Sequence, residues 1–176
     1  AAIDAALALG IPVKTNTVVM KGINENQIVP ILEYAARTGF EPRFLEFMKI
    51  GPLKAQHAQY FLAADEMLQA IEHQHGRIHQ IPVEIDSTAI VFGNSVIPRF
   101  GIIASESYPF CGNCSRLRLT ATGKLYGCMM HTHGIDLKAY LRWTPEQIPC
   151  AIAEAVGSKP LQRIVQGFET MNVLGG

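Results

Sequence analysis

Three of the four cysteines lie close together in the sequence, and their spacing is its strongest chemical signal. Two residues separate Cys111 from Cys114, a spacing at which a tight turn directs both sulfurs toward one metal centre. From Cys114 onward the sequence alternates polar and apolar residues around a Thr-Gly turn, which predicts a hairpin that returns Cys128 to the start of its first strand. The pattern therefore predicts that three thiolates converge.

Three thiolates leave a metal centre one ligand short. In a [4Fe–4S] cluster this leaves one iron open to another molecule, by the same logic that separates open from closed zinc sites. Period-2 alternation places Arg116 and Arg118 on one strand face, with Leu117 and Leu119 on the other. Guanidinium groups match phosphate oxygens, so a phosphorylated ligand is expected there. The alternative left open is that the arginines only solvate an exposed face.

Two other interpretations of the same region stay open. In the first, His131 or His133 completes a closed Cys₃His zinc site with the three cysteines. In the second, the chain is a partner-binding module without catalysis, because an unfinished parallel sheet exposes unpaired backbone groups and apolar helix faces. Cys150 lies apart from the other cysteines and is expected to be a small buried residue.

Composition limits the classes of function. The formal net charge is zero, 48% of the residues are hydrophobic and 17% are charged, which argues against a nucleic-acid platform. No apolar run reaches the ~20 residues that span a bilayer, and the chain does not begin like a signal peptide. A cytoplasmic protein is expected, in which cysteines serve metal binding better than disulfides.

Hydrophobic periodicity predicts two regions. Residues 1–80 read as strands over 11–20 and 41–48, each followed by a helix, one ending at Gly39 with Asn24 as its cap and one ending at Gly76. This alternation is typical of βαβ units in a parallel sheet. Because a complete barrel takes about 250 residues, residues 1–80 can be only the last βα units of an incomplete (β/α) barrel.

Residues 81–176 form the second predicted region. The runs "TAIVFG", "RFGIIAS" and "RLRLTA" are short strands broken by Gly, Pro and Ser, and a helix over 144–157 follows. We expect a smaller α+β region with antiparallel strands that carries the three-cysteine site. The fold class is thus α/β followed by α+β.

Three single residues in the first region also call for a role. Lys14 lies in an apolar strand, where an ammonium is costly to bury unless an anion meets it, although a strand-end lysine can also reach solvent. Met48 falls at the carboxyl end of a predicted barrel strand, the end at which barrels place ligands. Glu46 serves either the mouth of such a site or a structural ion pair, and the sequence does not choose.

The segment "FCGNCSRLRLTATGKLYGCMM" resembles the C-terminal cluster motif of the molybdenum cofactor biosynthesis protein A family, radical S-adenosylmethionine enzymes with GTP 3′,8-cyclase activity. "VKTNTVVMKGIN", "RFLEFMKIG", "RFGIIAS" and the terminal "GG" resemble the same family in the same order. The resemblance implies an incomplete barrel of TIM type with one [4Fe–4S] cluster on a Cys-x-x-x-Cys-x-x-Cys motif. A second cluster, held by three cysteines, binds GTP at its open iron.

The resemblance also implies roles for individual residues. Cys111, Cys114 and Cys128 hold the second [4Fe–4S] cluster, and Met48 lines the S-adenosylmethionine site. No catalytic residue is assigned, but the Gly175-Gly176 tail, which the family inserts toward its active site, is a candidate. The implied GTP ligands are Lys14, Arg116, Leu117 and Arg118.

The implied activity of the full-length enzyme is the conversion of GTP to (8S)-3′,8-cyclo-7,8-dihydroguanosine 5′-triphosphate, a lyase reaction of molybdenum cofactor biosynthesis. No cysteine precedes Cys111, so the motif for reductive cleavage of S-adenosylmethionine is absent, and Thr122 stands where the family usually has Asp. We therefore expect a C-terminal half that is inactive alone. Its expected partners are GTP, the missing N-terminal half and, functionally, a downstream cyclic pyranopterin synthase; a homodimer is left open.

Overall fold

The computed structural model describes residues 2–83 and 87–162. It divides into two compact units. The first unit comprises the chain up to Met48 together with Gln56–Pro109, and the second comprises Lys49–Ala55 and the chain from Phe110. The sequence predicted a boundary after residue 80. The boundary differs because the strands after residue 80 pair with the first sheet instead of starting a new one.

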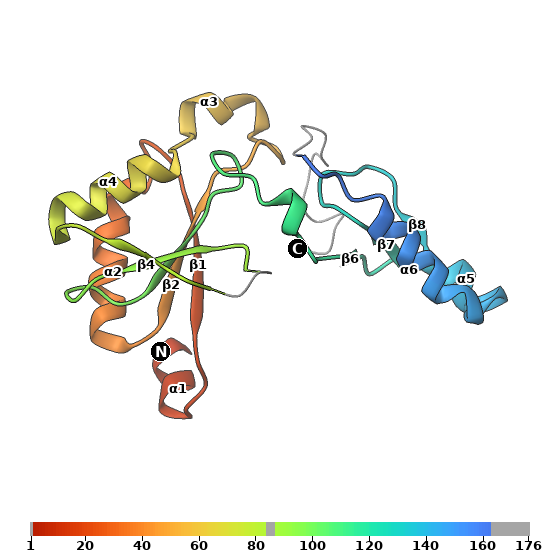
Figure 1. Ribbon diagram of the computed structural model, residues 1–176, viewed down its shortest axis with the longest axis horizontal. Helices are drawn as coiled ribbons and strands as arrows, with labels where there is room; N and C mark the ends of the chain where they lie inside the picture. Colours follow the sequence, from red (N-terminus) through yellow and green to blue (C-terminus); the bar gives the residue numbers. More distant parts are fainter. Residues whose placement is uncertain (1, 84–86, 163–176) are drawn as a thin grey trace. The chain divides into compact units, whose positions relative to one another are not determined.

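The first unit is built on a five-stranded sheet in the order β1-β2-β5-β4-β3. Strands β1, β2 and β5 are parallel, whereas β4 pairs antiparallel with both β5 and β3 (Figure 1). The strand bounds are Lys14–Val19 (β1), Glu41–Glu46 (β2), His79–Ile81 (β3), Ile90–Gly93 (β4) and Phe100–Ile103 (β5). The sheet is therefore mixed, and a barrel stays a prediction.

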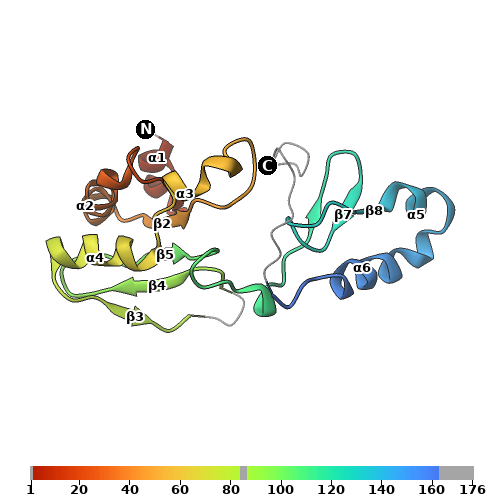
Figure 2. The ribbon, with the colours of Figure 1, turned by 90° about the horizontal axis from the view of Figure 1, so that it is seen from above.

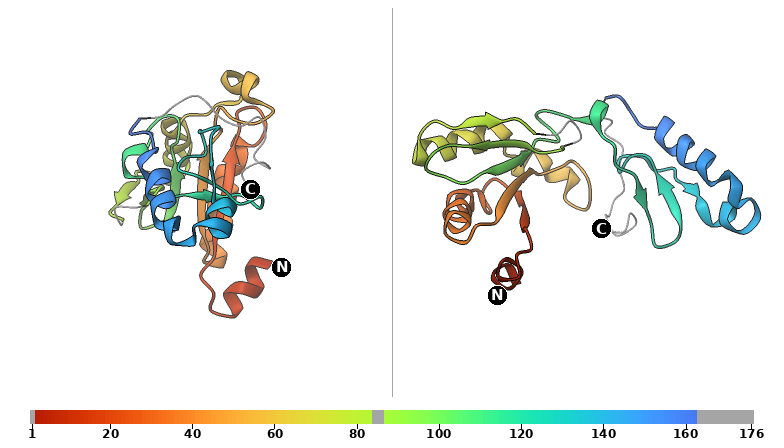
Figure 3. Two further views of the ribbon diagram at one scale, coloured as in Figure 1. Left: turned by 90° about the vertical axis from the view of Figure 1, so that its right-hand side faces the viewer. Right: turned by 60° about the horizontal axis from the view of Figure 1, so that its bottom comes forward.

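Two helices cover one face of this sheet, α2 (Ile28–Thr38) and α4 (Ala64–His75) (Figure 2). Their buried residues pack with those of β2 and β5 in one apolar core, which includes Phe44, Phe100 and Met67. Short elements complete the unit: α1 (Ala2–Ala8), η1 (Glu25–Gln27), η2 (Lys54–Gln56, which begins in the second unit) and α3 (His57–Tyr60). Helix α1 buries no residue and stands clear of the sheet (Figure 3).

Most predicted elements of the first unit are confirmed. Gly39 follows α2 in the left-handed conformation with φ 91°, as a helix-ending glycine does. Asn24 is the N-cap residue of η1, the turn that leads into α2, but its side chain makes no capping hydrogen bond. Its side-chain oxygen accepts from the Met20 amide at 2.7 Å, and the turn η1 intervenes before α2 begins. None of the helices in the described ranges is long and apolar enough to cross a membrane.

The second unit holds a three-stranded antiparallel sheet in the order β6-β7-β8. Asp136, in the last of these strands, caps helix α5 by accepting from the Lys138 amide at 3.0 Å. The predicted helix over 144–157 is confirmed as η4 followed by α6, whereas α5 was not predicted. The element bounds are η3 (Cys111–Asn113), β6 (Arg118–Leu119), β7 (Lys124–Tyr126), β8 (Ile135–Asp136), α5 (Leu137–Trp143), η4 (Pro145–Gln147) and α6 (Ile148–Gly157).

A buried carboxylate joins three segments of the first unit. Glu46, at the end of β2, is 1% exposed. Its two oxygens accept from the backbone amides of Ala64 (2.8 Å), Glu106 (2.6 Å) and Ser107 (2.9 Å), and from the Ser107 hydroxyl. Ala64 opens α4, and Glu106 and Ser107 follow β5. The structure therefore gives Glu46 a structural role through hydrogen bonds to neutral donors, and the described residues offer it no ion pair of the kind that the sequence left open.

We predict that Glu46→Gln destabilises the protein by about 2–3 kcal/mol, because an amide NH₂ would face two donors that lose their acceptor. Urea unfolding followed by circular dichroism measures the loss. Glu33→Gln, on the exposed side of α2, is the matched control and should change stability by less than about 0.5 kcal/mol. Equal stability of the two variants would contradict the role given to Glu46.

Candidate metal and nucleotide site

The first two cysteines lie at the two ends of one short turn. Turn η3 begins at Cys111, and the Cys114 amide donates to the Cys111 carbonyl at 3.3 Å. Both side chains are half-buried, as is that of Cys128. The turn that the two-residue spacing predicted is thus present.

The predicted hairpin is also confirmed. Strands β6 and β7 pair with Arg118 opposite Tyr126 and Leu119 opposite Leu125. The turn between them closes through a Gly123 amide that donates to the Thr120 carbonyl at 2.9 Å, with Gly123 at φ 85°. Thr122 does not disturb this turn.

Instead of opening the turn, the Thr122 hydroxyl lies 2.8 Å from that of Thr120. The Thr120 hydroxyl in turn accepts from the Lys124 amide at 2.9 Å. The hydroxyl groups of Thr120 and Thr122 therefore support this turn, although Thr122 departs from the Asp that the sequence analysis named as usual there.

The two arginines are held differently from each other. Strand β6 begins only at Arg118, so Arg116 precedes the strand and the predicted alternation does not extend to it. The Arg116 guanidinium stacks on the Phe110 ring, 5.2 Å from its centroid. Leu119 is 59% exposed. Both arginines nevertheless lie on the short segment that leads out of the cysteine turn.

Cys128 follows β7 in a tight turn of its own. Its sulfur accepts from the Met130 amide at 3.4 Å, and its carbonyl accepts from the His131 amide at 3.1 Å. Two backbone hydrogen bonds therefore hold the turn that carries Cys128.

Lys159 links the two cysteine segments, and the sequence analysis missed it. Its ammonium donates to the carbonyl oxygens of Arg116 (2.6 Å) and Gly127 (2.9 Å) and to the Cys114 sulfur at 3.6 Å. One nitrogen thus contacts the segment after the first two cysteines and the residue before Cys128. No motif marks a lysine so far along the chain, so only the fold reveals it.

The electrostatics around Cys114 favour its thiolate. Burial by itself raises the pKa of the Cys114 thiol, but hydrogen bonds from the Arg116 backbone and guanidinium and the charges of Lys159 and Arg116 outweigh it. The net effect is a pKa lowered from the ordinary cysteine value. The thiolate is the form of cysteine that acts as nucleophile and metal ligand.

The donors fit an iron–sulfur cluster in kind, since three cysteine sulfurs lie on two segments that the Lys159 ammonium joins. Within residues 2–83 and 87–162, however, no three side chains of His, Cys, Asp or Glu form a group ready to hold a metal. The convergence of the three sulfurs was therefore not observed, and their role as ligands stays a prediction.

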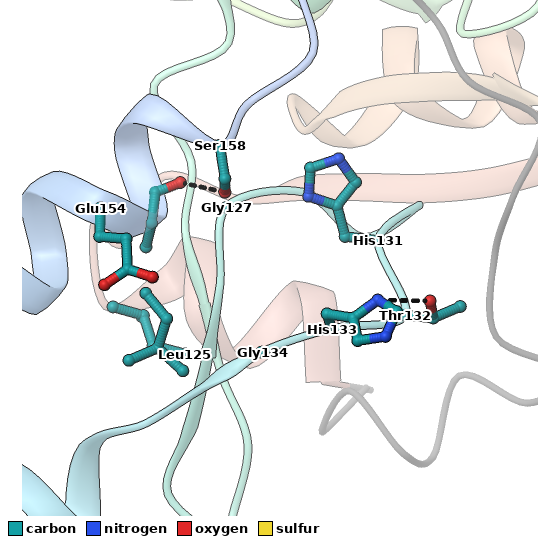
Figure 4. A pocket seen from close by; sticks show the side chains of 10 residues that line it. Leu125, Gly127, His131, Thr132, His133, Gly134, Glu154 and Ser158 are labelled. Atoms are coloured by element: carbon teal, nitrogen blue, oxygen red, sulfur yellow. Dashed lines mark hydrogen bonds between the residues drawn. The ribbon is translucent and has the colours of Figure 1, made fainter.

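The two histidines of the zinc alternative lie elsewhere in the same unit. His131 and His133 line a cavity of about 360 Å³ together with Glu154 and Ser158 (Figure 4). The His133 Nδ1 lies 3.2 Å from the Thr132 hydroxyl. None of the residues lining this cavity is a cysteine, so the described geometry does not favour a Cys₃His zinc site.

Cys150 was wrongly predicted to be buried. It is exposed in the first turn of α6, because Ala151 and Ala155 form the buried stripe of that helix and Cys150 lies beside it.

Lys14 lies in a cluster of three cations around one carboxylate in the first unit. The Lys14 ammonium is 3.7 Å from Glu41 Oε1 and its side chain is 50% exposed. The Nε atoms of Arg43 and Arg99 lie 3.3 Å and 3.1 Å from the two oxygens of the same carboxylate. The lysine thus contacts an anion and also reaches solvent. Each of the two alternatives from the sequence, a compensating anion and exposure to solvent, therefore holds in part.

Strand register explains why these groups lie together. Lys14 is opposite Glu41, and Arg43 is opposite Gly101 on the next strand. A Cβ on Gly101 would lie only 3.1 Å from the Arg43 side chain, so the glycine leaves space for it. The cluster therefore occupies the face of the sheet opposite to the core helices, and alternation along β2 could have revealed Arg43.

Two predicted residues remain. Met48 is half-buried just beyond the carboxyl end of β2, as expected. The adjacent Phe47 carbonyl lies 2.8 Å from His57 Nε2, and the His57 ring stacks on the Phe47 ring. Gly175 and Gly176 lie outside the described residues.

Residues 40–164 match the family model described as Molybdenum Cofactor Synthesis C. The chain belongs to this family. It is 34% identical over 174 residues to a GTP 3′,8-cyclase of Synechocystis sp., covering 99% of this chain and 52% of the relative. GTP 3′,8-cyclases of Staphylococcus epidermidis and Staphylococcus aureus are 38% and 41% identical over 143 and 145 residues, in each case 80% of this chain and 42% of the relative. The chain therefore spans about half the length of these curated relatives.

We predict that Gly127→Ala displaces α6 and destabilises the protein by about 2 kcal/mol or more. The added Cβ would overlap the Ala155 carbonyl oxygen and lie 2.7 Å from the Ser158 hydroxyl. Thermal unfolding measures the effect. In the control Gly157→Ala the Cβ meets no atom within 4 Å, so this variant should keep the wild-type midpoint. A wild-type midpoint for Gly127→Ala as well would show that α6 does not pack on Gly127 as described.

Proposed function

We propose that the chain is a part of a GTP 3′,8-cyclase that binds GTP at a [4Fe–4S] cluster held by Cys111, Cys114 and Cys128. The family match carries the proposal, because it covers the cysteine turn, the hairpin and α6 together. The relatives are named for a cyclisation of GTP. The three half-buried cysteines and the ammonium between their segments support the same assignment.

In this proposal the cluster offers an iron without a protein ligand, and S-adenosylmethionine with a further cluster, on a part of the enzyme outside this chain, supplies the radical chemistry. This chain's task is to bind and orient GTP. Arg116 and Arg118 follow the cysteine turn directly. Their guanidiniums are therefore close to a nucleotide bound at the cluster and contact its phosphates. The backbone of Leu117 lies between them.

The cations of the first unit suit a polyphosphate ligand. Lys14, Arg43 and Arg99 carry three positive charges against the one negative charge of Glu41. A triphosphate carries enough negative charge to compensate the two that remain, and Lys14 is the residue of this cluster that we propose as a GTP ligand. Met48, beyond the end of β2, would face S-adenosylmethionine in the complete enzyme.

The cluster assignment is tested by anaerobic reconstitution of this chain with iron and sulfide. We predict about four irons and four sulfides per chain, with the broad visible absorption of an iron–sulfur cluster. Cys128→Ala should lose most of this content, whereas the exposed Cys150→Ser should keep it. Stoichiometric zinc in place of iron, or unchanged iron in Cys128→Ala, would contradict the assignment.

GTP binding is tested on the reconstituted chain by equilibrium dialysis without oxygen. We predict that Arg118→Ala weakens binding about tenfold, the effect of losing ~1.5 kcal/mol of charge-assisted hydrogen bonding. Arg142→Ala removes an equal charge from the exposed part of α5 and should change the affinity less than twofold. If both variants weaken binding equally, the effect comes from overall charge and not from a phosphate contact.

A further inference from the structure

The ammonium of Lys159 occupies a defined position among three acceptors in the second unit. Two are carbonyl oxygens, from Arg116 and Gly127, and the third is the Cys114 sulfur. A lysine has three donors, so this set matches its capacity. The acceptors come from segments on either side of the hairpin, and the lysine comes from a third segment after α6.

The backbone that carries Lys159 is itself fixed. The amides of Ser158 and Lys159 donate to the carbonyls of Glu154 (2.9 Å) and Val156 (3.1 Å), which continues the helical winding past the end of α6. The same end of the helix packs directly on Gly127, where no larger residue fits. The fixed backbone therefore limits the positions that the Lys159 ammonium can take.

The charge of Lys159 has no anionic side chain to neutralise it among the residues that the structure describes, where its partners are one sulfur and two carbonyls. Of these three partners, the Cys114 sulfur is the one assigned to the proposed cluster, so the charge lies next to a ligand sulfur. Hydrogen bonds to ligand sulfurs and nearby net charge are two of the factors that set the reduction potential of iron–sulfur clusters.

We propose that Lys159 is a positioning residue of the cluster site, which ties the two cysteine segments together and raises the reduction potential of the bound cluster. The inference rests on the proposed function, since it requires the cluster on Cys114. The physical reason is that adding an electron makes the cluster more negative, and a fixed cation beside a ligand sulfur stabilises that reduced state. The two carbonyl contacts hold the cation where it has this effect.

Three substitutions separate the hydrogen bonds of Lys159 from its charge. Lys159→Met removes both, Lys159→Gln keeps a hydrogen-bond donor without the charge, and Lys159→Arg keeps the charge. Lys138→Met is the control, because Lys138 is an exposed lysine of the same unit that packs on Gly123, at the opposite end of the hairpin from the cysteines. Each chain is reconstituted anaerobically, and its iron, sulfide and midpoint potential are measured, the last by a reductive titration followed by electron paramagnetic resonance.

We expect Lys159→Met to lose at least half of its iron and sulfide and to shift the potential of the remaining cluster to a more negative value. Lys159→Gln should shift the potential in the same direction with less loss of iron. Lys159→Arg and Lys138→Met should stay close to wild type in potential. If Lys159→Met does not fold, as judged by circular dichroism, the comparison of the Gln and Arg variants decides in its place.

The two proposals fail in different ways. A wild-type chain that takes up no cluster refutes the proposed function and the inference with it. A wild-type chain that holds the cluster while the neutral variants keep its potential refutes the role of Lys159 alone. A purely structural role for Lys159 would lower the iron content but leave the potential of the loaded fraction unchanged, and that result also overturns the inference.

Discussion

The buried carboxylate of Glu46 is the constraint on which the arrangement of the first unit depends. Removing a carboxylate from water is costly unless hydrogen bonds replace the lost hydration, and four donors from two other segments do so here. The amide of Ala64 belongs to the first turn of α4, where the helix dipole also favours a negative charge. An apolar side chain at this position could fill the space but could not fix three segments in one register. The end of β2, and with it Met48, is held in place by this contact.

The two faces of the sheet in the first unit have different roles. On one face Phe44 and Phe100 pack under α2 and α4, and their burial supplies the stabilising free energy. On the other face Glu41 holds its three cations apart from this core. Alternation along β2 assigns neighbouring residues to opposite faces, so Phe44 can be fully buried while Arg43 stays available to an anion. This is how a chain of zero net charge can offer a locally positive surface.

Local signals made much of this fold predictable, and long-range packing set the rest. The strands β1 and β2 and the helix α4 follow from periodicity and from helix-ending glycines, and the hairpin follows from its Thr-Gly turn. The domain boundary did not follow, because strand pairing decides it: Phe100–Ile103 lies parallel to β2 although its neighbours in sequence look antiparallel. The exposure of Cys150 depends in the same way on which side of α6 packs inward. Lys159 could not be predicted at all, since its three acceptors are assembled only by the tertiary fold.

At the cysteine site, spacing in the sequence predicts which segments lie together but not how the sulfurs are oriented. Spacing guarantees that Cys111 and Cys114 share a turn, and the hairpin guarantees that Cys128 returns to their neighbourhood, but neither dictates the orientation of three sulfurs. Negative charges that lie close together repel one another, and a nearby positive charge reduces that repulsion. Lys159 provides such a charge through contacts that are mostly to backbone carbonyls, which do not depend on the state of the sulfurs. A chain arranged in this way keeps its two cysteine segments adjacent through its own contacts, so the entropy of ordering them is lost during folding.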